Sequence, residues 1–273
     1  MIATTVTVAA LPFAGQSALA ASTQPVPDAP TVQSLAAMRD GFKWGITHVD
    51  VLNTFNKLGG VIDQDYDPLL RHAQPGIQQQ SIEGDRDNKK AAIERSYIRF
   101  DTPTGYDQTA LRTEYSYKNN EAIMMVERQG KKRYFFFMGA EPGERLWKIY
   151  DEIPLNAQGS LGKTFAEAVT RVQGILGVGG RSRPADRDHG LDFGTVDWQD
   201  GTTHLRLLDR GNVAGVVLEE RATVNALPQL RSHKAEDPFA MDPSIAAATR
   251  GGVSDPSQAS AAPSASAAKP KKK

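Results

Sequence analysis

Two stretches of the chain, residues 45–60 and 162–177, show the same pattern of apolar and polar positions. Apolar side chains recur at three- and four-residue spacing in both stretches, which predicts an amphipathic helix with one buried face. Thr47 and Thr164 stand where a helix N-cap is needed, and glycines suited to a left-handed C-cap end both stretches. The pattern predicts two equivalent helices, each of which opens one unit of the fold.

Acidic residues follow both predicted N-caps after three positions. Glu167 follows Thr164, which predicts the fuller capping box, and Asp50 follows Thr47 as an acidic residue in the first helical turn. His48 takes the position that a phenylalanine has in the second stretch, on the predicted buried face. We therefore expect His48 to be a core histidine with its polar atoms satisfied.

Two further helices are predicted between the first helix and the strands, at residues 65–73 and 82–97. Three aspartates alternate along residues 63–67 with the spacing of a calcium-binding loop. Pro68 and Gln74, however, stand where such a loop has its glycine and its bidentate glutamate. The better interpretation is an acidic turn before a helix that starts at Pro68.

An antiparallel meander of four strands is predicted for residues 113–153, after this helical insert. The dipeptides Asn119-Asn120 and Gln129-Gly130 are suited to tight hairpin turns, because their residues tolerate positive φ. The register that these turns predict pairs Tyr115 with Met124, Met124 with Phe135 and Ala122 with Phe137.

The second predicted helix leads to a polar loop and then to a meander of three strands, at residues 192–198, 202–209 and 213–224. A turn at Asp200-Gly201 would place His204 opposite Asp197. Each half is thus a helix followed by antiparallel strands, and the predicted fold class is α+β with two tandem units.

The domain organisation follows from these patterns and from composition. The two helix-plus-meander units are expected at residues 35–155 and 156–243. A Pro-rich linker at residues 21–34 precedes them. Residues 244–273 form a tail of Ala, Ser and Pro that ends in lysines and buries too little apolar surface to fold.

Residues 1–20 contain no charge, and they end in the small-residue pattern Ala18-Leu19-Ala20 after an apolar stretch. This pattern is typical of a secretory signal peptide. The alternative, a membrane anchor, would need about 20 apolar residues, and polar residues and a proline interrupt this stretch. We expect export to the periplasm or the medium, with no transmembrane segment in the mature chain.

Composition excludes several classes of function. The 32 Lys and Arg residues balance 32 Asp and Glu residues, so the basic excess of a nucleic-acid-binding protein is missing. The chain has no cysteine, which excludes disulfides, cysteine-ligated zinc and thiol nucleophiles. No cofactor is expected. The terminal lysines allow weak contact with an anionic surface.

Both faces of the predicted aromatic sheet are apolar. A sheet of this kind is either covered on both sides or presents a patch to a partner. The helical insert is the favoured cover for the second face; if that face is open, it is the best binding candidate in the chain. The residues of this candidate patch are Ile123, Met125, Tyr134 and Phe136.

A charged loop in the second half is the other candidate for chemistry. Asp186, Asp188 and His189 could ligate a divalent ion, although one histidine with scattered aspartates does not define a closed set of ligands. Aspartate and glycine are also what an exposed turn needs. The predicted Asp197–His204 pair resembles half of a catalytic triad. No serine stands in a nucleophile elbow, so no residue is assigned as catalytic.

The glycine, capping threonine, acidic residue and apolar helix before a meander form a recurring motif. Its residues are Gly45, Thr47, Asp50 and Val51 in the first unit and Gly162, Thr164 and Glu167 in the second. The motif resembles SmpA/OmlA-type small lipoproteins of the outer-membrane barrel-assembly machinery, and the tandem plan is similar to β-lactamase-inhibitor-protein-like modules. The chain departs from the lipoproteins because it lacks a lipid-bearing cysteine and has the helical insert.

The resemblance implies an envelope or secreted protein that works by binding. The leading hypothesis is a non-enzymatic binding or scaffold module with an envelope protein as its partner. The alternative is a hydrolase of envelope polymers, either without a metal ion or with one held in the charged loop. Whether the protein is an enzyme stays open, with the balance toward binding.

Overall fold

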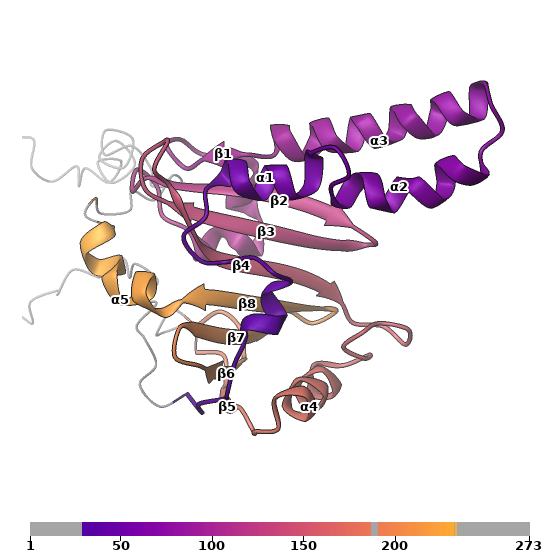
Figure 1. Ribbon diagram of the computed structural model, residues 1–273. Coiled ribbons are helices and arrows are strands. Elements are labelled where there is room, and N and C mark those ends of the chain that lie inside the picture. Colours follow the sequence, from indigo (N-terminus) through magenta and orange to yellow (C-terminus); the bar gives the residue numbers. More distant parts are fainter. Residues whose placement is uncertain (1–28, 187–190, 232, 234–273) are drawn as a thin grey trace, which may run out of the picture. The chain divides into compact units, whose positions relative to one another are not determined.

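One antiparallel sheet of eight strands forms the centre of the computed structural model, which describes residues 29–186, 191–231 and 233 (Figure 1). The strand order is β1-β2-β3-β4-β8-β7-β6-β5, so both predicted units contribute to one sheet and meet where β4 pairs with β8. The strands are β1 (Ile98–Arg99), β2 (Glu121–Arg128), β3 (Lys131–Met138), β4 (Arg145–Pro154), β5 (Arg181–Arg183), β6 (Thr195–Gln199), β7 (Thr203–Asp209) and β8 (Val213–Glu220).

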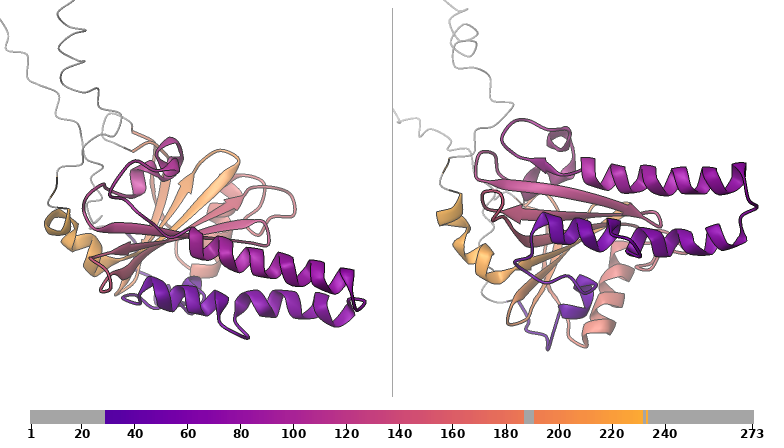
Figure 2. Two further views of the ribbon diagram at one scale, coloured as in Figure 1. Left: turned by 90° about the horizontal axis from the view of Figure 1, so that it is seen from above. Right: turned by 45° about the horizontal axis from the view of Figure 1, so that its top comes forward.

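Helices cover both faces of this sheet (Figure 2). The α-helices are α1 (His48–Asn56), α2 (Val61–His72), α3 (Ile77–Arg95), α4 (Phe165–Leu176) and α5 (Arg221–Leu230). The short 3-10 helices are η1 (Ala36–Arg39), η2 (Gly105–Gln108) and η3 (Ala110–Glu114). The prediction of an α+β fold is confirmed, and the duplication of two units stays a prediction. None of the described helices is long and apolar enough to cross a membrane.

The first core lies under α1, the first half of α2, the end of α3 and α4. Val51 and Phe55 of α1 pack against Phe135 and its neighbours on β2 and β3, as Ala168 and Val172 of α4 pack over the second half. Such burial contributes roughly 1.5–3 kcal/mol for each large apolar side chain.

The second core lies on the opposite face of the sheet. Phe100, Leu111 and Tyr115 from the segment between β1 and β2 pack there together with Val224 and Leu227 of α5. The rings of Phe100 and Tyr115 are stacked with centroids 3.7 Å apart. Both faces of β2, β3 and β4 are therefore buried, which explains why these strands are nearly continuous runs of apolar residues.

Several predicted elements are confirmed. The Gln129-Gly130 turn has positive φ at both residues, and β2 and β3 pair with Met124 opposite Phe135 and Ala122 opposite Phe137, as predicted. Gly177 ends α4 in the left-handed conformation.

The capping pattern differs from the prediction at two points. The first is the end of α1, which stops at Asn56 with Lys57 as its C-cap at φ −58°, so the predicted glycine cap is found only at α4. The second is the N-terminal capping box. Thr47 and Asp50 form a complete capping box, in which each side chain accepts from the backbone N–H of the other. At α4, Thr164 accepts from the Glu167 N–H, but the Glu167 carboxylate accepts from Lys163 N at 2.8 Å. The complete box belongs to α1 because the Glu167 side chain reaches past the N-cap residue.

Other elements differ from the prediction because tertiary packing replaces local pattern. Residues 113–117 do not form the predicted strand, because η3 ends at Glu114 and Tyr115 packs into the second core. The short β1 pairs with β2 and forms the edge of the sheet instead. Residues 221–230 form α5 rather than the end of a strand. The aspartates of residues 63–67 lie within α2, which starts at Val61 and includes Pro68. The polar loop after α4 contains β5.

The start of the fold lies inside the predicted linker. Thr31 forms a bridge with Gln199 of β6, and Ala29 and Val32 are buried. Residues 29–34 therefore extend the packing of the second half, although they come from the other end of the chain. The predicted signal peptide at residues 1–20 and the tail at residues 244–273 lie outside the described residues.

Two glycines should respond to alanine in opposite directions. Gly180 faces the core, where a Cβ atom would lie 2.3 Å from Val196 Cγ1 and 2.4 Å from Trp198 Cζ2. Gly180→Ala is expected to lower the unfolding free energy by about 1–3 kcal/mol through overpacking. Gly174→Ala, inside α4 with no atom within 4 Å, should raise it by roughly 0.5–1 kcal/mol. Urea unfolding of both variants measures the contrast, and equal shifts would contradict the packing described for Gly180.

Candidate partner-binding site

The predicted aromatic patch lies inside the fold. Ile123 and Phe136 are fully buried and Tyr134 is 5% exposed, while Met125 is partly buried against them. The four side chains point into the second core, and the segment between β1 and β2 covers them there. The helical insert lies on the opposite face of the sheet, over the first core. Three of these side chains are therefore core residues and Met125 packs against them, so the four do not form an open docking surface.

The predicted metal loop is only partly described. Asp188 and His189 lie outside the described residues, and Asp186 forms a backbone bridge with Leu191 through two hydrogen bonds of 2.8 Å. Across the described part of the chain, no group of three or more His, Asp or Glu side chains is placed to hold a metal ion.

Asp197 and His204 lie close together but not directly opposite each other. Asp197 pairs with Arg206 and His204 with Gln199, because the two-residue turn is Gly201-Thr202 and not Asp200-Gly201. His204 Nε2 is 4.0 Å from Asp197 Oδ1 across the diagonal. Both side chains are buried, so the pair is enclosed and does not face a substrate.

His204 belongs to the edge of a buried group of charges on this face. The ionic network consists of Glu114, Lys148, Arg206 and Glu219. Lys148 Nζ lies 2.8 Å from Glu114 Oε2 and 3.2 Å from Glu219 Oε1, and Arg206 Nη2 lies 2.7 Å and 2.9 Å from the same two oxygens. Lys148 is completely buried. Two cations thus bridge two carboxylates between η3, β4, β7 and β8.

The ionic network keeps its carboxylates ionised. Burial alone would raise the pKa of Glu114 and Glu219, but the charges of Arg206 and Lys148 outweigh burial and hold both pKa values below the ordinary 4.5. A buried charge of this kind is stable only while its partners are present. We interpret the ionic network as a structural joint between the halves of the sheet.

His48 lies at the start of α1 and is not fully buried. Its Nδ1 lies 2.5 Å from Glu144 Oε1, and its ring stacks on Tyr97 with centroids 4.1 Å apart. Burial would raise the pKa of Glu144, but hydrogen bonds from the His48 side chain and from backbone N–H groups lower it overall. The prediction of a satisfied histidine fits its Nδ1, while the core position belongs to Val51 one turn later.

A helical hairpin formed by α2 and α3, which we call the arm (Val61–Arg95), carries a long exposed section. Figures 1 and 2 show its far end projecting beyond the strands. The buried side chains of α2 end at Tyr66, and the only buried one of α3 is Ile93. Between these positions every side chain has solvent access. The buried contacts of the arm are thus confined to its root, which we define as residues 61–66 of α2 and Ile93 of α3, while Leu70 and Ile82 add partly buried contacts to the first core.

Polar contacts hold the arm root in place. Asp65 makes a bidentate pair with Arg128 of β2, with N–O distances of 2.5 and 2.6 Å. Asp63 pairs with Lys90 between the two helices, and Tyr66 donates to Asp85 at 2.5 Å. Burial, followed by the contact with Asp85, raises the pKa of Tyr66 to about 12. Two of the three aspartates that suggested a calcium loop, Asp63 and Asp65, thus bind side chains of α3 and β2.

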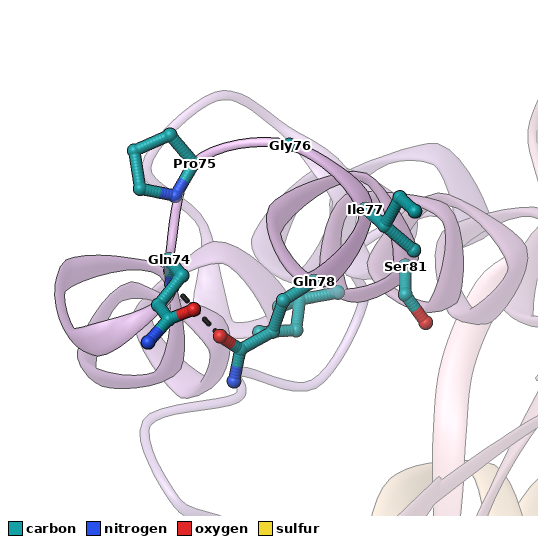
Figure 3. Close-up of a pocket in the computed structure, with 7 residues that line it drawn as sticks. Gln74, Pro75, Gly76, Ile77, Gln78 and Ser81 are labelled. Carbon is teal, nitrogen blue, oxygen red and sulfur yellow. Dashed lines mark hydrogen bonds between the residues drawn. The ribbon is translucent and has the colours of Figure 1, made fainter.

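The arm tip, residues 73–82, contains a hollow beside an exposed isoleucine (Figure 3). Gly76 forms the bend with φ 105°, a conformation that favours glycine, and Gln78 Oε1 accepts from Gln74 N at 2.8 Å. The open hollow has a volume of about 850 Å³. Ile77 is 88% exposed, and Leu69 of α2 is 53% exposed. The residues that line the hollow are Gln74, Pro75, Gly76, Ile77, Gln78, Ser81 and Ile82.

The sequence pattern predicted helices at residues 65–73 and 82–97, whereas α2 starts at Val61 and α3 at Ile77, so the exposed Ile77 lay outside both predicted helices. The apolar residues of α3 are few and spread around the helix, so no continuous apolar face distinguishes its exposed part from its buried part. The available signal was an uncharged stretch from Ala73 to Ile82 in a chain with 23% charged residues.

Comparison of the chain with models of known families, with curated proteins and with solved structures found no match. The resemblance to SmpA/OmlA-type and β-lactamase-inhibitor-protein-like modules therefore stays a prediction.

Removal of one root contact should loosen the arm. Arg128→Ala removes the partner of Asp65, and because this pair is partly exposed the expected loss of unfolding free energy is only about 0.5–1 kcal/mol. Hydrogen exchange should accelerate in α2 and α3 more than elsewhere. Lys131→Ala, in the β2–β3 hairpin that also contains Arg128, is the matched control. Unchanged exchange in the arm of the Arg128 variant would refute the anchoring role.

The ionic network should make stability depend on acid pH. Glu114 and Glu219 have depressed pKa values in the folded state, so their contribution is present above the unfolded pKa and is lost as pH falls through the folded pKa. Glu219→Gln removes one of the two carboxylates that Lys148 and Arg206 share. The unfolding free energy should fall by about 3–5 kcal/mol near neutral pH.

Urea unfolding between about pH 5 and pH 2 measures this dependence. The Glu219→Gln variant should lose stability less steeply on acidification than the unmodified protein. Asp87→Asn, at an exposed side chain of α3, is the control and should keep the full slope. An unchanged slope in the Glu219 variant would show that the ionic network does not control acid stability.

Proposed function

We propose that this protein is a non-enzymatic protein-binding module and that the arm tip is its docking surface. The observation that supports this proposal is the 88% exposure of Ile77 at the end of an anchored helical hairpin. Burial of such a side chain in an interface contributes roughly 1.5–3 kcal/mol. Within the fold, Ile77 stays exposed and does not make this contribution to stability.

The root contacts support the same proposal. A rigid arm loses little conformational entropy when a partner binds, and pre-organisation of this kind favours affinity. The ties of Asp63, Asp65 and Tyr66 fix the first turns of α2, so the tip is presented in a defined position.

The setting that we propose is the cell envelope or the medium. The uncharged, apolar residues 1–20 with their small-residue ending support export by a signal peptide. The partner would then be an exported or envelope protein. The terminal lysines would add at most weak contact with an anionic surface.

Site-specific photo-crosslinking tests the docking surface. A benzophenone amino acid at position 77 should give a discrete protein adduct in intact cells that make the protein. The same amino acid at position 175, where Ile175 of α4 is 72% exposed, is the matched control and should give none. The proposal fails if position 77 gives no adduct or if both positions give the same adducts.

A further inference from the structure

We propose that the occupant of the arm tip is a second copy of this chain, so that two arms meet tip to tip about a two-fold axis. This inference rests on the proposed function, because it names the partner of the same docking surface. Two-fold interfaces use one surface patch on both subunits, so the patch has to be complementary to itself. The arm tip meets this requirement in charge, in hydrogen bonding and in shape.

The first argument is charge. Identical residues approach each other near a two-fold axis, where a charged side chain would face its own copy and repel it. The arm tip contains no Asp, Glu, Lys, Arg or His from Ala73 to Ile82. A partner chosen by opposite charge would instead need a charged tip to recognise.

The second argument is hydrogen bonding. Gln74, Gln78 and Gln80 are exposed at the tip. A glutamine amide has both donors and an acceptor, so it can pair with an identical amide from the other copy. Aspartate or lysine side chains would not pair with themselves in this way.

The third argument is shape. Ile77 protrudes from the surface next to the open hollow at the bend between α2 and α3. Ile77 is itself one of the residues that line the hollow, so a two-fold axis through the tip would bring each isoleucine against the hollow lining of the other copy. Ile82 and the ring of Pro75 give this hollow an apolar part. One protrusion and one hollow on the same patch are what a reciprocal contact needs.

Analytical ultracentrifugation of the full chain over a concentration series tests the proposal. The expected result is a reversible dimer with twice the mass of one chain. Ile77→Glu should raise the dimer dissociation constant by at least about tenfold, because it places two carboxylates together in a desolvated contact. Ile175→Glu, at an exposed position outside the arm, should leave the dimer unchanged. A monomer at every concentration overturns the proposal, as does a dimer that Ile77→Glu does not weaken.

Cysteine crosslinking locates the contact. The chain has no cysteine of its own, so Ser81→Cys should form a disulfide-linked dimer under mild oxidation, and the exposed loop variant Gln158→Cys should not. Crosslinking at position 158 alone would place the dimer contact elsewhere and overturn the inference. If the chain is monomeric while position 77 captures a different protein, the second copy is excluded and the docking function stands. If position 77 captures nothing and the chain is monomeric, both fail.

Discussion

Two carboxylates buried on one face of the sheet, Glu114 and Glu219, impose the strongest constraint on this fold. Buried charges need partners with good geometry, and here Lys148 and Arg206 supply them from β4 and β7. A shift of either strand by one residue would move its cation to the opposite face. The register of the central strands and the position of η3 are thus tied to one set of ion pairs.

This constraint divides the sheet into regions with different cover. In the first half, aromatic side chains fill both faces, and the two cores bury them under helices on one side and under the β1–β2 segment on the other. In the second half, the same face as the ionic network also holds Asp197 and His204. Polar side chains on this face are therefore part of the joint between strands.

Local signals in the sequence predicted the elements that depend on local chemistry. The Gln129-Gly130 turn fixed the β2–β3 register, and the threonine caps marked the starts of α1 and α4. The prediction failed where distant contacts decide. Tyr115 leaves the strand pattern because Phe100 offers its ring a stacking partner. The turn after β6 moves because the Asp200 carboxylate accepts from Thr202, Thr203 and Leu35 N–H groups.

The candidate site was the least predictable part, because the residue type alone does not tell whether a side chain is buried or exposed. Ile77 and Ile93 lie in the same helix, yet one is 88% exposed and the other 3%. The difference arises from how far α3 extends past the sheet.

The first described residues pack on the second half of the sheet, and the last described helix packs on the first half. Residues 29–32 from the beginning of the fold lie along β6, and α5 from its end closes the second core, where Arg231 pairs with the buried Glu121 of β2. Asn119 and His233 add two reciprocal hydrogen bonds at the same place. Each half therefore completes the interior of the other. Separation of the chain near residue 155 would open both cores at once, so the halves are expected to unfold together as one cooperative unit.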